Sequence, residues 1–136
     1  MERYFTACDY INHDVINRYC QDYNKTQEFA RDVFKQLLKW LHISQLTQFQ
    51  GSALVMSEAI AELDNMWHTF ILFTKDYEEF CLTYYKCFIH HSPVTTETPK
   101  LTLDESKNFY RKYFTLIIEE FGESTLISWF KEKKYA

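Results

Sequence analysis

Residues 62–81 read ELDNMWHTFILFTKDYEEFC, and residues 88–93 read FIHHSP. Together with Cys87, which lies between them, these two stretches concentrate the potential metal ligands of the chain, with three of its five histidines and two of its four cysteines. The residues concerned are His68, His90, His91, Cys81 and Cys87. No other part of the sequence is as dense in side chains that bind metals or transfer protons. The folding of the first stretch therefore decides both the architecture and the position of any site.

The composition favours an all-α fold. The chain has 136 residues, of which 46% are hydrophobic and 18% aromatic, enough to form the core of one ordinary domain. It contains only two glycines and two prolines, too few for the turns of a many-stranded sandwich or barrel. We therefore expect a compact single-domain bundle of about six helices over residues 1–136.

The charge pattern disfavours two classes of partner. The formal net charge is −4, and no run of five or more like charges occurs. Nucleic acids and anionic membranes both require a basic face, so we expect neither as a partner. The sequence has no apolar window of about 18 residues and no N-terminal run of signal-peptide length. We expect a cytoplasmic protein with reduced cysteines, and leave open export without a signal peptide.

Apolar residues recur at helical spacing along most of the chain. Thr26 is expected to cap the second helix, Thr102 and Glu105 to form a capping box, and Gly122 to end a helix in the left-handed conformation. The predicted helices span residues 9–23, 27–42, a segment starting near Ser52 or Ser57, 75–85, 102–121 and 124–133. The predicted connections are a polar stretch over residues 43–52 and a loop over residues 92–99.

Whether the helix breaks near Thr74 decides whether His68 and Cys81 can lie close together. On one unbroken helix, Cys81 would lie about 20 Å from His68 along the axis and on roughly the opposite side. Thr74 is followed by acidic Asp76 and Glu78, a pattern typical of a helix N-terminus. We therefore predict a reversal into an antiparallel helix pair, which would bring Cys81 level with His68.

Asp64 and His68 are four residues apart and share one helix face. That spacing suits a carboxylate that orients an imidazole, or two ligands of one ion. With Cys81 and with His90 or His91 they would offer the nitrogen, sulfur and oxygen ligands that zinc accepts, although no close-spaced zinc motif occurs. The alternative is structural: Asp64 pairs with a basic residue, His68 bonds within the core, and the two later histidines lie in an ordinary loop.

Three segments carry a resemblance to a known family: Asp64-x-x-Trp67-His68, Tyr77-x-x-Phe80-Cys81 and Phe88-x-His90-His91-x-Pro93. They resemble the signature of small bacterial relatives of the glycine-rich domain-containing proteins, and Gly122-Glu123 and Trp129 resemble that family's closing segment. The resemblance covers about residues 55–131. It implies a shared metal or polar site more than an activity, because that family is largely uncharacterised. The chain has Tyr85-Lys86 where these relatives tend to have Phe-Gly, a departure in the turn before the histidines.

The first functional hypothesis is a small soluble protein-interaction module, an adaptor or an inhibitor-like regulator of another protein, without catalytic activity of its own. The small size, the many Tyr, Phe and Trp residues and the lack of a complete catalytic set favour it.

The alternative is a metal-dependent enzyme or metal-binding protein that uses zinc or iron with the ligand set Asp64, His68, Cys81, His90 and His91. An enzyme of this kind needs an open coordination position and a general base such as Glu62 or Glu78. A third hypothesis is a thiol enzyme with Cys81 as nucleophile beside His68. The sequence contains no H-E-x-x-H, G-x-S-x-G or phosphate-binding glycine loop.

Overall fold

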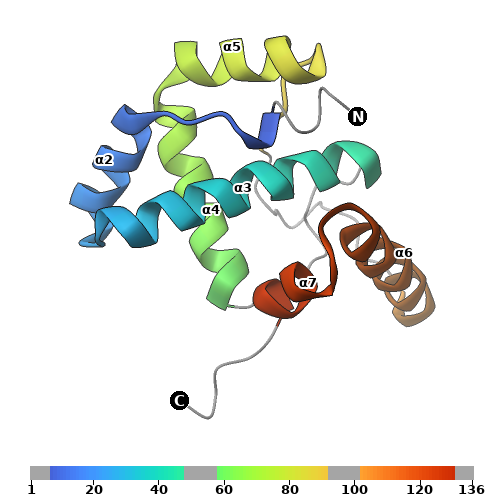
Figure 1. Ribbon diagram of the computed structural model, residues 1–136. Helices are drawn as coiled ribbons and strands as arrows, with labels where there is room; N and C mark the ends of the chain where they lie inside the picture. Colours follow the sequence, from blue (N-terminus) through green and yellow to red (C-terminus); the bar gives the residue numbers. More distant parts are fainter. Residues whose placement is uncertain (1–6, 48–57, 92–101, 131–136) are drawn as a thin grey trace. The chain divides into compact units, whose positions relative to one another are not determined.

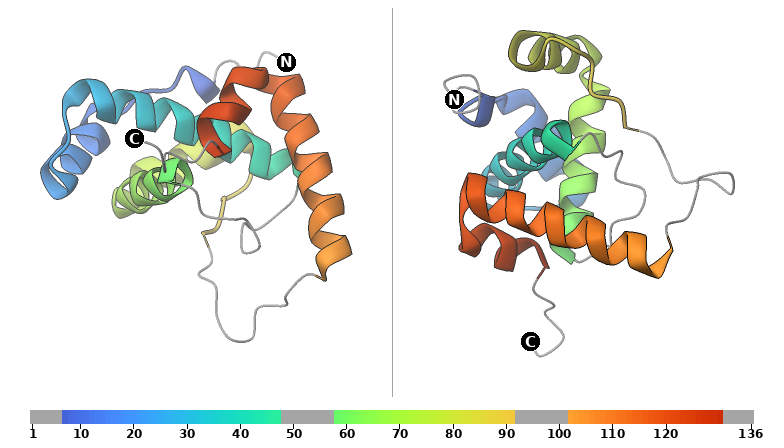
Figure 2. Two further views of the ribbon diagram at one scale, coloured as in Figure 1. Left: turned by 90° about the horizontal axis from the view of Figure 1, so that it is seen from below. Right: turned by 90° about the vertical axis from the view of Figure 1, so that its right-hand side faces the viewer.

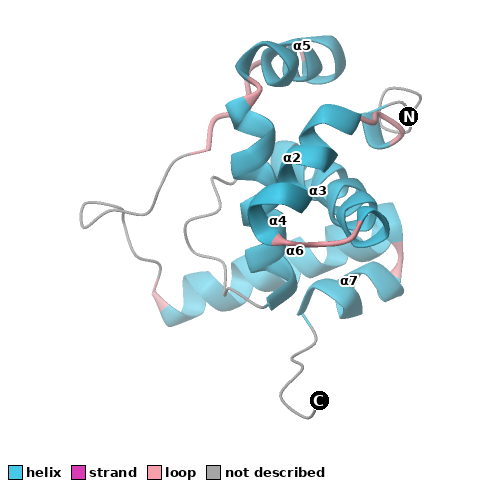
Figure 3. Ribbon diagram, turned by 90° about the vertical axis from the view of Figure 1, so that its left-hand side faces the viewer, coloured by secondary structure: helices cyan, strands magenta, loops and turns pink. Residues whose placement is uncertain are grey.

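A computed structural model describes residues 7–47, 58–91 and 102–130, and within these ranges the chain forms helices and no strands (Figures 1 and 3). Over the described residues, the all-α expectation and the expected number of about six helices are confirmed. The helices are α2 (His13–Tyr23), α3 (Gln27–Thr47), α4 (Glu58–Leu72), α5 (Thr74–Tyr85), α6 (Leu103–Phe121) and α7 (Glu123–Phe130). None of these helices combines the length and the apolar character needed to cross a bilayer.

Contacts group the described chain into two units. The first holds residues 7–42 and 61–89, and the second holds the remaining described residues. Aromatic rings fill the centre of the first unit. The Phe70 ring lies 5.4 Å from that of Phe34, 5.5 Å from that of Phe80 and 5.0 Å from that of Tyr77, between ring centroids. These rings come from α3, α4 and α5, so the core ties together helices that are distant in sequence.

Helices α2 and α3 both begin at side-chain caps. α2 starts at His13 rather than at residue 9, because the Asn12 side chain accepts a hydrogen bond of 3.2 Å from the backbone N–H of Val15. The predicted cap of α3 is confirmed, since the Phe29 N–H donates to Thr26 Oγ1 over 3.1 Å. The expected connection over residues 43–52 is wrong as far as Thr47, where α3 ends. Ile43 is fully buried and extends the apolar stripe of α3 beyond residue 42.

The predicted break between α4 and α5 is confirmed. α4 ends at Leu72, Phe73 forms a bend, and α5 starts at Thr74. Thr74 is the first helical residue and not the cap, because Phe73 holds the cap position without a side-chain hydrogen bond. α5 then crosses the end of α4 instead of running back along it (Figures 1 and 2), so the expected antiparallel pairing is wrong. The predicted start of α4 near Ser52 or Ser57 lies outside the described residues.

In the second unit, α6 and α7 pack against each other through aromatic rings. The predicted capping box is present, with a bond of 3.1 Å from the Glu105 N–H to Thr102 Oγ1. Gly122 has the positive φ of 93° that favours glycine, but its ψ of 165° is not that of the left-handed helix expected there. The Phe130 ring contacts the Phe114 ring at 4.9 Å. The loop predicted over residues 92–99 lies outside the described residues.

Candidate metal centre

Asp64 and His68 lie one turn apart on the solvent-facing side of α4. His68 Nε2 is 3.5 Å from Asp64 Oδ2, and the two side chains are 55% and 32% exposed. The other side of α4 is apolar, and its buried residues Leu63, Met66 and Phe70 pack into the first unit. This amphipathic division leaves the carboxylate and the imidazole together at an open surface.

Trp67, next to His68 in sequence, faces inward and starts a chain of hydrogen bonds. Its indole Nε1–H donates to the Tyr77 hydroxyl over 2.9 Å, and the Tyr77 hydroxyl donates to the backbone carbonyl of Ile89. Tyr77 is 1% exposed and Ile89 4% exposed, so both bonds are shielded from water. We call Trp67, Tyr77 and Ile89 the buried relay. It fastens the segment after α5 to both α4 and α5.

His91 follows the anchored Ile89 by two residues and reaches the pair on α4. One ligand atom each of Asp64, His68 and His91 can be chosen so that all three lie within 4.8 Å of one another. It is the only such group of three histidine, cysteine or acidic residues within the part of the chain that the structure describes. We call these three residues the open cluster, because His68 is exposed and the other two are half-buried.

The open cluster suits the coordination geometry of a single metal ion. Nitrogen and oxygen ligands lie about 2.0–2.2 Å from zinc, which places two neighbouring ligand atoms about 3.0–3.5 Å apart. The 3.5 Å between Asp64 and His68 already meets this requirement. Ligand atoms that are up to 4.8 Å apart reach the required separation when a side chain moves by about 1–2 Å. Two imidazoles and one carboxylate form a donor set used by zinc and by non-haem ferrous iron.

Two other predicted ligands, Cys81 and His90, are not part of the open cluster. Cys81 is fully buried, and burial is the main cause that raises the pKa of its thiol. The thiol lies against the Tyr77 side chain and the backbone of Ile89, so it borders the buried relay. His90 is exposed. Cys81 lies on α5, which crosses the end of α4 instead of running back along it (Figure 1).

The two candidate bases differ in their surroundings. Glu62 accepts a hydrogen bond from the Tyr19 hydroxyl and lies 3.8 Å from the Lys25 ammonium. It is two residues from Asp64, so it points to a different side of α4. Glu78 is exposed on α5 and lines a pocket there.

Lys86 forms the turn that directs the chain from α5 towards the histidines. It has φ 61° and ψ 16°, the left-handed conformation, and its backbone N–H donates to the Leu82 carbonyl over 3.2 Å. An L-residue with a side chain adopts this conformation at a cost of about 1–2 kcal/mol. The resemblance implies glycine at this position, and the observed conformation gives a physical reason for glycine there. The turn forms in this chain with lysine.

The role of Tyr77 was not predicted from the sequence. Trp67 and Tyr77 belong to the quoted signature, but spacing alone assigns them no task. The sequence did contain one indication of this role, a tryptophan and a tyrosine at core positions of consecutive helices. Buried Trp N–H and Tyr O–H groups need hydrogen-bond partners, so the two could be expected to pair. Nothing in the sequence indicated that the second partner would be a main-chain carbonyl.

Residues 3–121 match the UCP032817-like family. The chain belongs to this family. The match includes α2 and α3, which the signature over residues 55–131 does not cover. The family is uncharacterised, so membership assigns no activity. No curated protein and no solved structure matches the chain. The resemblance to the glycine-rich domain-containing proteins stays a prediction.

Proposed function

We propose that this UCP032817-like protein binds one divalent transition metal, zinc or ferrous iron, through Asp64, His68 and His91. The observation that carries the proposal is the convergence of these three ligand atoms within 4.8 Å. The first two come from one face of α4, and the third follows a segment that the buried relay holds in place. The donor set is one that both metals accept.

Three protein ligands leave coordination positions for water or another molecule. A tetrahedral ion would keep one such position and an octahedral ion three. Because the open cluster borders solvent, these positions are accessible from outside. A metal in such a site acts as a Lewis acid that polarises a bound oxygen or lowers the pKa of bound water. The proposed centre thus resembles exchangeable or catalytic sites more than closed structural ones.

Calorimetric titration of zinc into untagged, chelator-treated protein tests this proposal. We expect one ion per chain, with affinity reduced about a hundredfold or more in His68→Ala and in His91→Ala, because each removes a direct ligand. His13→Ala is the matched control, since His13 is also exposed and also lies on a helix but is remote in sequence from the site. Its affinity should equal that of the unaltered protein.

The same titration decides the composition of the ligand set. Cys81→Ala should keep the affinity, and a large loss would instead add the thiol to the ligands. Failure of zinc, cobalt and ferrous iron to bind at one equivalent would contradict the proposal.

A second candidate is the protein-interaction module, in which the chain docks on a partner protein in the cytoplasm. It is favoured by exposed apolar side chains of the second unit, where Leu103 is 71%, Ile118 44% and Ile127 50% exposed. A partner isolated by crosslinking should be lost in the double variant Ile118→Glu with Ile127→Glu and kept in His68→Ala. A partner retained by the double variant would argue against docking through these residues.

A further inference from the structure

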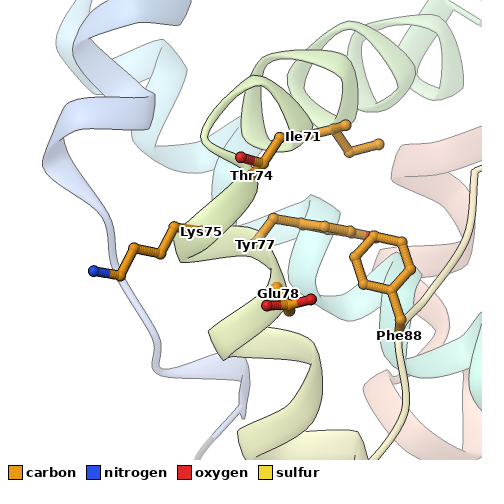
Figure 4. Close-up of a pocket in the computed structure, with 6 residues that line it drawn as sticks. All are labelled: Ile71, Thr74, Lys75, Tyr77, Glu78 and Phe88. Atoms are coloured by element: carbon orange, nitrogen blue, oxygen red, sulfur yellow. The ribbon is translucent and has the colours of Figure 1, made fainter.

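A pocket of about 440 Å³ lies where α4 meets α5, within the first unit (Figure 4). Its size falls in the range of small-molecule sites, about 300–1,000 Å³. The lining residues come from the last turn of α4, the first turns of α5 and the segment after α5. They are Ile71, Thr74, Lys75, Tyr77, Glu78 and Phe88.

The pocket adjoins the open cluster along α4. Ile71 follows His68 by three residues and Asp64 by seven, so the three side chains share one stripe of the helix. The rise between His68 and Ile71 is about 4.5 Å. A molecule in the pocket therefore lies about one helical turn from the proposed ion.

The segment after α5 also contributes residues both to the pocket and to the open cluster. Phe88 lines the pocket, and His91 of the open cluster follows it by three residues. Tyr77 belongs to both regions, because its ring borders the pocket and its hydroxyl holds the Ile89 carbonyl. The two regions thus share their supporting residues.

One side of the pocket offers a surface for a flat apolar group. The Phe88 ring meets the Tyr77 ring edge-on, with centroids 5.3 Å apart and planes at 88°. Figure 4 shows Ile71 and Tyr77 extending towards the side where the Phe88 ring lies, whereas Lys75 points the opposite way. Phe88 is 39% exposed although it is a large aromatic residue, so its ring is accessible to a ligand.

We propose that the pocket binds the aromatic ring of a small chelating acid whose two adjacent oxygens coordinate the metal of the open cluster. The inference rests on the proposed metal site and adds the class of its ligand. Ile71 and Phe88 hold the ring, and the open coordination positions take the oxygens. The ligand class is an aromatic ring with a bidentate oxygen head, as in an aromatic 2-hydroxy acid or a hydroxamic acid.

Two probes with the same chelating head separate ring binding from metal binding. Benzohydroxamic acid carries a phenyl ring, and acetohydroxamic acid carries a methyl group in its place. We expect cobalt-loaded protein, followed through the cobalt absorption spectrum, to bind the phenyl probe at least about tenfold more tightly, because the ring removes apolar surface from water.

Phe88→Ala should reduce the preference for the phenyl probe to less than about threefold without changing the affinity for acetohydroxamic acid. Phe29→Ala is the matched control, because Phe29 is 40% exposed and Phe88 39% exposed, and it should keep the full preference. Ile71→Trp, which fills the pocket from α4, should remove the preference by a second route.

The possible failures are distinguishable. If cobalt binds and the two probes bind equally well, the pocket inference is wrong and the metal site stands. If neither Phe88→Ala nor Ile71→Trp lowers the preference, the ring lies elsewhere and the inference is also wrong. If cobalt, zinc and ferrous iron all fail to bind, both the proposed function and this inference are wrong.

Discussion

Trp67 and His68 are neighbours in sequence but belong to two regions with opposite surroundings. Trp67 is part of the buried relay, which is shielded from water and has its hydrogen bonds satisfied. His68 is part of the open cluster, whose side chains border solvent and offer ligand atoms within 4.8 Å of one another. The buried relay contributes stability and position, and the open cluster is where we propose that a metal ion binds.

This comparison indicates that buried hydrogen bonds can fix the positions of side chains at the surface of a short helical protein. An exposed contact between a carboxylate and an imidazole, such as that of Asp64 with His68, is worth little by itself, about 0–1 kcal/mol. The third proposed ligand, His91, needs a stronger interaction to hold it near this pair. The Tyr77 hydroxyl does this by bonding the main chain two residues before His91. Changes to the relay should therefore affect both stability and metal binding, and changes to the cluster should affect metal binding alone.

The largest loss of stability is expected for Tyr77→Phe. This change removes two buried hydrogen bonds, the one that the Trp67 N–H donates and the one that the Ile89 carbonyl accepts, at a cost of about 2–3 kcal/mol. Chemical denaturation of metal-free protein measures the loss, and zinc affinity should fall about tenfold as His91 loses its support. Tyr84→Phe, the control, removes no hydrogen bond within the described part of the chain, so both quantities should stay unchanged. Equal effects in the two variants would disprove a special role of Tyr77.

Cys81→Ala should cost about 1–2 kcal/mol, because it removes a fully buried side chain of moderate size. Burial raises the pKa of this thiol in the folded state, whereas the unfolded chain releases the proton near pH 8.5. The contribution of the neutral Cys81 thiol to stability is therefore complete below about pH 8.5, and it falls as the pH rises towards the folded-state pKa. Urea unfolding at pH 7 and 9.5 should show a smaller decline for Cys81→Ala than for Cys87→Ala, where the residue is exposed. Identical declines would contradict the buried, neutral thiol.

Lys86→Gly should stabilise the protein by about 0.5–1 kcal/mol. Glycine removes the cost of the left-handed conformation, about 1–2 kcal/mol. Its greater conformational freedom in the unfolded chain offsets about half of that gain. Thermal unfolding measures the gain. Lys75→Gly, in the first turn of α5, is the control and should destabilise. A loss of stability in Lys86→Gly would mean that the turn at residue 86 has another conformation.

The smallest effect is expected for His68→Ala on the stability of metal-free protein, within about 0.5 kcal/mol, because the side chain is exposed and its pairing with Asp64 is weak. Denaturation without metal measures it. With excess zinc, the unaltered protein should become more stable and the variant should not. A large loss without metal would place His68 in the structural region instead.

The sequence predicted much of this architecture because the governing interactions are local. Apolar spacing, the Thr26 cap and the Thr102–Glu105 capping box depend on residues within a few positions of one another. The break near Thr74 was also visible locally. The direction of α5 after the break was not, since it depends on rings from three helices packing around Phe70.

The site was predictable only in part for the same reason. Asp64 and His68 follow from helical spacing, and His91 was among the candidates. Sequence spacing could not separate His91 from His90 or from Cys81, because the buried relay that positions His91 joins residues far apart in the chain. The single-domain expectation for residues 1–136 stays a prediction.

Crystals grown with cobalt and measured across the cobalt absorption edge test the central claim most directly. The account predicts one anomalous peak per chain, bound by a carboxylate oxygen of Asp64, by Nε2 of His68 and by a ring nitrogen of His91. The Tyr77 hydroxyl should remain bonded to the Ile89 carbonyl in the same crystals. A peak coordinated by Cys81, or no peak near α4 at saturating cobalt, would contradict it.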